Sequence, residues 1–299
     1  MKRRRDARLF KEKDDAVAGI VVAVMIVGLI IAVISVVQTI YVPKWMEQIE
    51  SEHMDDVADQ FAMLKYAIDT QVLVEQSTPI STPITLGNKE LPFLVSSKAF
   101  GDLAVLDDQF SFKIEYDTGA NQYGSDVIRY VSENAYYLDQ SYIYEAGALI
   151  LSQSDGNVMT MKPIFYAEKD ESSPLLNKFN ITFTMVEIEG KGDKTTVSGY
   201  GTYPIQTQYD KKTVDDPFTD IEYIEIITAY PLVWQRFIND TLKNSGMEYG
   251  QDDHYTVSVV EAEGVLWSVT IDILEDNCKV ELFFTRSIVS AQIAPGWVE

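Results

Sequence analysis

The pattern of hydrophobic and polar positions is dominated by one uncharged stretch, residues 16–42, filled mostly by valine, isoleucine, alanine, leucine and methionine. As an α-helix it would be roughly 40 Å long, enough to cross a hydrocarbon core of about 30 Å. Backbone groups in lipid must bond to one another, so a helix is favoured despite the β-branched residues. The pattern predicts a transmembrane helix, on which Gly19 and Gly28 leave notches for close helix packing, without the GxxxG spacing.

A second helical pattern follows Pro43, which we expect to end or kink the membrane helix. Residues 43–76 predict an amphipathic stalk helix, because apolar side chains recur at spacings of three and four. The apolar stripe comprises Trp45, Ile49, Val57, Phe61, Leu64, Ile68 and Val72, with His53 in one position, and the polar face carries Glu50, Asp55, Asp56, Asp59 and Lys65. Two interpretations stay open: the stripe packs on the following domain, or part of it meets neighbouring subunits.

Beyond a proline-containing linker at residues 77–83, short alternating or apolar runs predict β-strands. The expected strands are 84–86, 93–95, 104–106, 110–116, 127–131, 140–144, 148–153, 158–162, 180–188, 194–209 (interrupted near Pro204), 221–228, 254–261, 265–274 and 279–288. Residues 119–125 read as a polar turn. One helix is expected at 231–245, with Pro231 in its first turn and Gly246 after its end.

These patterns predict an α+β protein: a single N-terminal transmembrane helix, a stalk helix, and a mainly antiparallel, sandwich-like β domain. The polar segment 163–174 is the expected boundary between a first β module (77–165) and a second (166–299).

Charge sets the expected orientation. Residues 1–15 form a basic leader with seven Lys or Arg against four acidic residues, which predicts a cytoplasmic N-terminus and an extracellular C-terminal domain in the cell membrane. No small-x-small cleavage site follows the apolar run, so we expect the span to be retained. The net charge of −22 argues against nucleic acid as a partner. The only cysteine is Cys278, so no intrachain disulfide forms.

The sequence offers little catalytic chemistry, and we expect a protein that is not an enzyme and takes no cofactor or metal. It has two histidines, His53 and His254, and no Gly-x-Ser-x-Gly elbow. The acidic pairs at 107–108, 215–216 and 252–253 lack EF-hand spacing, so solvated loop charges are favoured over calcium ligands. Asn180 and Asn239 begin Asn-x-Thr sequons and are candidate glycosylation sites; Asn239 is the poorer acceptor because it falls in the expected helix.

The basic leader, the sequence DDAVAGIV at residues 14–21 and the long Val/Ile helix with its stalk and β domain together resemble an archaeal type IV pilin with a class III signal peptide. Residues 144–153 (YEAGALILSQ) are similar to a stretch in archaeal membrane-anchored proteins of that architecture. The resemblance implies cleavage by a prepilin peptidase near Lys13 and Asp14, although pilins usually carry Gly or Ala before the cut.

Two functional hypotheses of different classes result. The first is a structural, pilin-like subunit of an archaeal surface filament or envelope assembly, with the lipid bilayer, copies of itself or other pilin-like subunits, and the prepilin peptidase as partners. The alternative is a membrane-tethered extracellular binding domain that forms no filament.

Overall fold

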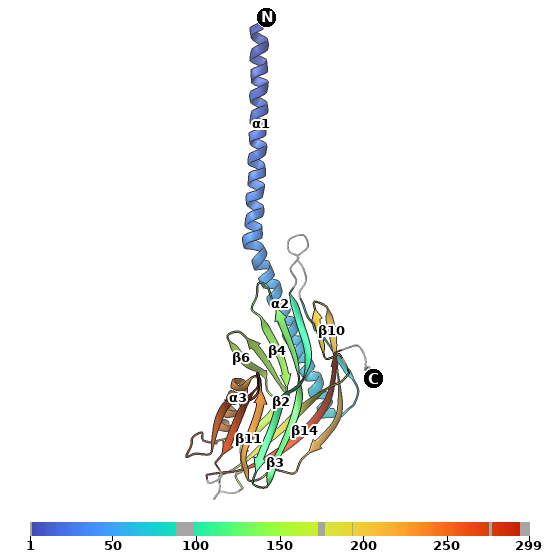
Figure 1. The fold of residues 1–299 in the computed structure, drawn as a ribbon, viewed down its shortest axis with the longest axis vertical. Helices are drawn as coiled ribbons and strands as arrows, with labels where there is room; N and C mark the ends of the chain where they lie inside the picture. Colours follow the sequence, from blue (N-terminus) through green and yellow to red (C-terminus); the bar gives the residue numbers. More distant parts are fainter. Residues whose placement is uncertain (1, 88–98, 173–176, 193, 275–276, 294–299) are drawn as a thin grey trace.

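The computed structural model describes the backbone of residues 2–87, 99–172, 177–192, 194–274 and 277–293, and the side chains of these ranges from Gly19 onward. The molecule consists of a long helix that projects from one end of a β domain (Figure 1). The expected strand at 93–95 falls outside the described residues.

The long helix is continuous through three segments: α1 (Lys2–Val36), the π-helical turn η1 (Val37–Tyr41) and α2 (Val42–Val74). Pro43 does not end it. A proline removes one backbone donor and its ring crowds the carbonyl four residues earlier, and the π turn relieves this, with the Val42 N–H bonding to the Val37 carbonyl. The bend therefore lies at η1, ahead of the proline (Figure 1). Among the described residues this is the one helix long and apolar enough to cross a membrane.

The β domain is a largely antiparallel sheet. Its strands are β1 (Ile80–Thr85), β2 (Phe100–Tyr116), β3 (Gly119–Glu133), β4 (Gln140–Glu145), β5 (Ala148–Gln153), β6 (Gly156–Met161), β7 (Ile164–Lys169), β8 (Lys178–Gly190), β9 (Thr196–Gly199), β10 (Thr202–Val214), β11 (Ile221–Thr228), β12 (Tyr255–Glu261), β13 (Trp267–Ile273) and β14 (Lys279–Ile293). The main path runs β1-β10-β14-β8-β3-β2-β11-β13-β12. β4, β5 and β6 extend from β3, while β7 pairs with β8 and β9 with β2. The pair β8–β14 is parallel.

Strands from the two predicted β modules pair within one sheet. β2, from the first, pairs with β9 and β11, from the second, and β3 joins β8 through the single pair Asp126–Ile188. The expected boundary at 163–174 contains a strand, β7. Chain order and sheet order differ, so local composition did not reveal which strands pair.

Other strand boundaries also differ from expectation. Residues 119–125 are not a turn but the first half of β3. This polar segment pairs with β2. The expected strands 104–106 and 110–116 join into β2 through a bulge at Asp108, where φ is 51°. The long strand 194–209 breaks at Tyr200 and Gly201, whereas Pro204 lies inside β10, opposite Pro83.

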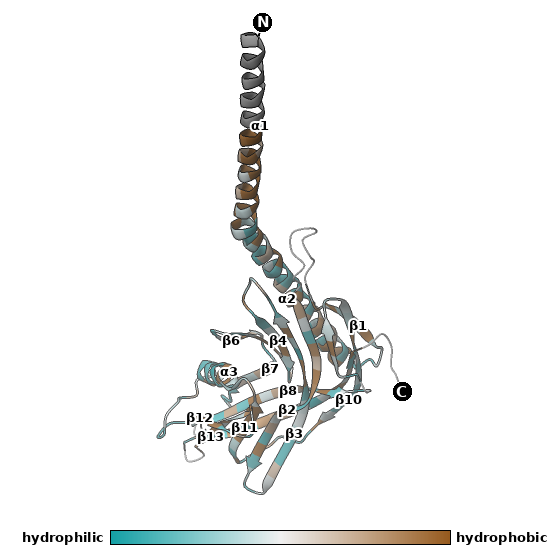
Figure 2. Cartoon of the chain, turned by 45° about the horizontal axis from the view of Figure 1, so that its top comes forward, coloured by the Kyte–Doolittle hydropathy of each residue, from teal (hydrophilic) through white to brown (hydrophobic). Residues whose placement is uncertain are grey.

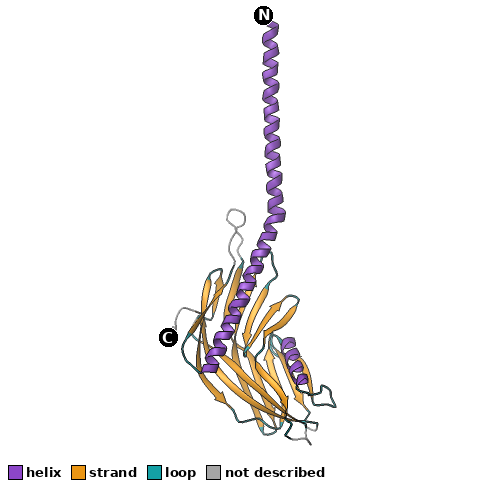
Figure 3. Ribbon diagram, turned by 180° about the vertical axis from the view of Figure 1, so that it is seen from behind, coloured by secondary structure: helices purple, strands orange, loops and turns teal. Residues whose placement is uncertain are grey.

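Two hydrophobic clusters form the core. One lies beneath the helix α3 (Pro231–Asn244), which confirms the predicted helix. There Phe112 of β2 packs on Phe183 of β8 and Phe284 of β14, with ring centroids 4.9 and 5.2 Å apart. Of the first residues of α3, Leu232 is exposed, whereas Val233 and Trp234 lie in the core. The other cluster lies between the sheet and α2, which runs along the back of the domain (Figure 3).

Candidate functional site

The most developed polar architecture in the described residues is the junction between α2 and the β domain. The lower part of the predicted stripe is confirmed: Val57, Phe61, Leu64, Ile68 and Val72 are buried. The ring of Phe61 stacks on Tyr142 at 5.7 Å. The first interpretation of the stripe, packing on the domain, therefore describes this half of the helix.

The upper part of the stripe differs from expectation. Trp45 is exposed, whereas Met46 and Met54, which are not part of the predicted stripe, are buried. Colouring by hydropathy shows the change along the helix: the coloured part of α1 is mostly apolar, whereas α2 alternates polar and apolar residues (Figure 2).

Glu50, expected on the polar face, is fully buried. Its Oε1 accepts a hydrogen bond from the Ala135 amide at 3.1 Å, and its Oε2 accepts bonds from the Tyr136 and Tyr137 amides, both at 2.7 Å. Three successive backbone N–H groups make a concavity that suits an anion, and hydrogen bonds to an ionised group are the stronger kind. Glu50 therefore fixes the β3–β4 loop, residues 134–139, to the helix.

Lys65 also departs from expectation: it is buried and pairs with Asp69 at 2.8 Å. Near the end of α2, Gln71 donates from Nε2 to the Thr78 and Thr207 carbonyls, each at 2.9 Å, and accepts from the Thr207 hydroxyl at 3.0 Å. Side-chain bonds to the β domain thus hold both ends of α2.

His53 lies between these two attachments. Its Nε2 is 3.3 Å from the Tyr130 hydroxyl, which donates to the Leu86 carbonyl at 2.9 Å. Burial lowers the pKa of His53, because removing the ring from water disfavours its charged form. This histidine is a part of the core contact between helix and sheet.

A second buried carboxyl, Glu145, lies in the other core cluster, at the start of a two-residue β4–β5 turn whose Ala146 and Gly147 have φ of 49° and 89°. Its Oε1 accepts hydrogen bonds from Trp234 Nε1 at 2.5 Å and from the Thr228 hydroxyl at 2.9 Å. Burial raises the pKa of Glu145 to about 7. Sequence reasoning missed this group; the signal was one acid inside the apolar run at 144–153.

The residues predicted from sequence are spread over the molecule. Gly19 and Gly28 lie on the exposed part of α1, where an added Cβ would meet no atom within 4 Å. Lys13 and Asp14 belong to the backbone of α1, and their side chains lie outside the description. Asn180 lies within β8, between β7 and β14. Asn239 lies in α3, where its Oδ1 accepts from the Tyr255 hydroxyl at 2.8 Å.

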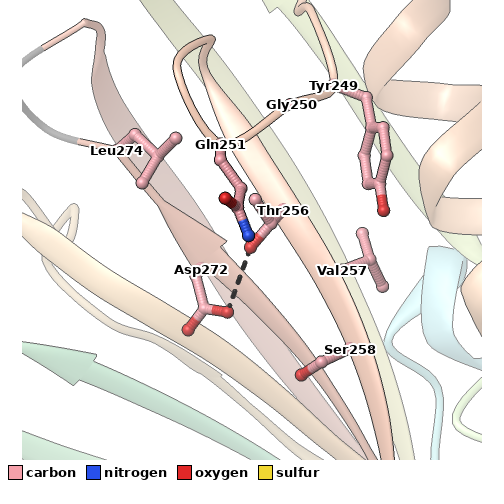
Figure 4. A pocket seen from close by; sticks show the side chains of 8 residues that line it. All are labelled: Tyr249, Gly250, Gln251, Thr256, Val257, Ser258, Asp272 and Leu274. Carbon is pink, nitrogen blue, oxygen red and sulfur yellow. Dashed lines mark hydrogen bonds between the residues drawn. The ribbon is translucent and has the colours of Figure 1, made fainter.

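The described residues contain no group of three or more His, Cys, Asp or Glu placed to hold a metal ion. His254 accepts at Nδ1 from the Glu248 amide at 2.9 Å, so this nitrogen serves a loop contact. A hollow of 510 Å³ lies beside β12 (Figure 4). Its one charged lining residue, Asp272, accepts from the Thr256 hydroxyl at 3.2 Å. A second hollow, of 500 Å³, separates the β5–β6 hairpin from α3 and includes Arg236.

Comparison with known proteins gives one match. A family model described as a family of unknown function (DUF7289) matches residues 16–274, which include the apolar helix, α2 and most of the β domain. No curated protein and no solved structure matches the chain.

Proposed function

This chain belongs to the family of unknown function DUF7289, and we propose that it is a membrane-anchored, pilin-like structural subunit of a cell-surface filament or envelope assembly. In this proposal the apolar half of the long helix lies in the bilayer or in a bundle of such helices. The β domain, a sandwich of two facing sheet halves, is displayed outside the cell.

The observation that carries the proposal is the unequal burial of the two halves of one continuous helix. On α1, Ile20, Met25 and Leu29 are 64%, 69% and 66% exposed, whereas α2 contributes a stripe from Met54 to Val72 to the domain core. An apolar surface of this extent is unfavourable in water and is covered by lipid or protein. The packed half holds the domain at a fixed position on the exposed half, which suits repeated assembly.

The leader charges support the orientation. Seven cations precede the span within residues 1–15, and basic residues next to a span remain on the cytoplasmic side. The acidic β domain then lies outside.

Gly28 provides the test. A side chain at this position meets nothing within the single chain, so Gly28→Leu leaves the fold and the hydrophobicity of the span intact. If α1 helices pack closely in an assembly, the variant remains in the membrane, while crosslinked oligomers and surface filaments decrease. Val24→Leu, at an exposed and already bulky site, is the matched control.

If the native chain is monomeric in membranes and Gly28→Leu changes neither crosslinking nor filaments, the membrane-tethered binding domain is the better account. The N-terminal residue of the protein recovered from membranes tests processing between Lys13 and Asp14 separately.

A further inference from the structure

The end of the β domain nearest α1 carries exposed aromatic and apolar side chains on two elements. On the helix, Tyr41 and Trp45 are 51% and 43% exposed, with ring centroids 6.0 Å apart. On the β3–β4 loop, Tyr136 and Leu138 are 39% and 50% exposed. We call these four residues the collar. Figure 1 shows that β3 ends, and β4 begins, beside the upper part of α2.

The loop half of the collar is held in place by hydrogen bonds. Glu50 binds the three amides of residues 135–137. Within the loop, the Asn134 amide bonds to Asp139 Oδ1 and the Asn134 side chain to the Leu138 carbonyl, both at 2.8 Å. The backbone is thus tied to the helix while Tyr136 and Leu138 remain outside the core. Their exposure is fixed by the loop's own geometry.

The collar lies at the depth of a membrane interface if the hydrocarbon ends near Val42. Trp45 follows three residues later, and Glu50 is about 12 Å beyond Val42 at 1.5 Å per residue. Helix side chains lean toward the N-terminus, so the carboxylate of Glu50 holds the loop closer to the membrane than its own Cα. The headgroup zone on each side is roughly 5–7 Å thick. Between the outer edge of this zone and the level of the Glu50 Cα about 5–7 Å remain, a distance that the length of a tyrosine side chain covers.

We propose that the β3–β4 loop rests in the interfacial layer of the same bilayer that α1 spans, so that the domain is bound to the membrane at two points. This inference depends on the proposed membrane anchor. The occupant is lipid because the collar continues directly from the apolar span, and because Tyr and Trp are the residue types enriched at this depth. Its acidic neighbours Glu47, Glu133 and Asp139 favour zwitterionic headgroups over anionic ones.

The test uses the full chain in nanodiscs of phosphatidylcholine, with a nitroxide label at one introduced cysteine per variant. Leu138→Cys reports on the collar and Val33→Cys on the span. Asp155→Cys lies in the exposed β5–β6 turn and is the reference for a position in water. All three positions are exposed, so the fold tolerates them, and the buried Cys278 supplies the background measured in the unsubstituted chain. Electron paramagnetic resonance then measures accessibility to oxygen, which enters lipid, and to a water-soluble nickel complex.

The expected result at position 138 is a loss of nickel accessibility relative to position 155, together with a gain in oxygen accessibility. If position 138 matches position 155 while position 33 lies in lipid, the loop contact is wrong and the anchor stands. Shielding of position 138 from both reagents means that a protein covers it, which also overturns the proposal. Nickel access at position 33 would instead refute the membrane anchor itself.

Discussion

Replacing Glu145 by glutamine isolates the effect of one buried charge on the stability of the β domain. The carboxyl lies in the core, where the described residues place the Trp234 and Thr228 donors beside it. Burial raises its pKa from the ordinary value of 4.5 to about 7. Glutamine keeps the size and an acceptor oxygen but does not ionise.

The magnitude follows from the linkage between protonation and folding. Below pH 4.5 both the folded and the unfolded states hold the proton, and the group makes no difference. Between pH 4.5 and 7 the unfolded chain loses its proton first, so the wild-type protein becomes less stable as the pH rises. The rise in pKa from 4.5 to about 7 corresponds to about 3 kcal/mol of folding free energy, all of it lost above pH 7. This destabilisation should be absent from Glu145→Gln.

The assay is denaturant unfolding of the full chain in detergent micelles, followed by tryptophan fluorescence, between pH 4.5 and 8. The quantity of interest is the difference in unfolding free energy between variant and wild type, since any constant effect of the amide cancels when two pH values are compared. This difference should move by about 3 kcal/mol in favour of the variant. Glu222→Gln, an exposed site on β11, is the control. Parallel pH profiles for Glu145→Gln and wild type would show that the carboxyl does not titrate as argued.

Three further changes test other parts of the structure. Glu50→Ala leaves three loop amides without their acceptor, so it should lower the free energy of unfolding by about 3 kcal/mol and speed hydrogen exchange in residues 134–139. Glu52→Ala, at an exposed site, should do neither. Normal exchange in the loop of the Glu50 variant would contradict the role of Glu50. Phe61→Ala should lower the free energy of unfolding by about 3–5 kcal/mol through the cavity it leaves, whereas Met63→Ala, at an exposed site, should lower it by less than about 0.5 kcal/mol. Equal denaturant midpoints for the two variants would contradict the packing of α2 in the core. Protease added outside intact cells should digest the chain beyond Val42, and full protection would reverse the orientation.

The sequence predicted those elements whose burial follows a local period. α3 and the lower stripe of α2 were found because every third or fourth residue is apolar, and β11 because its residues alternate. The upper stripe was wrong because the buried face of α2 continues there at regular helical spacing through polar residues, Glu50 and His53. Apolar content alone favoured Trp45, which lies one position away from the buried Met46 and is exposed.

The burial of Glu50 and Glu145 could not be predicted from the residues near them in the sequence. Glu50 reads as a surface charge, since a carboxylate enters a core only with partners. Its partners come from a loop 85–87 residues away in the chain. For Glu145 the donor Trp234 is 89 residues away. Strand order could not be predicted for the same reason: alternation along β2 specifies which face is buried, but not that β11 will be its neighbour.

The position of β14 has a consequence for how the protein is made. β14 lies between β10 and β8 and pairs along β8 from Lys279 to Ala291. Without it both neighbours would have open edges, which invite wrong pairing. Such distant pairings also close slowly. The sheet therefore cannot be completed before residues 279–293 have been made. Maturation depends on the arrival of β14, so a chain interrupted before Lys279 remains recognisable to quality-control proteases.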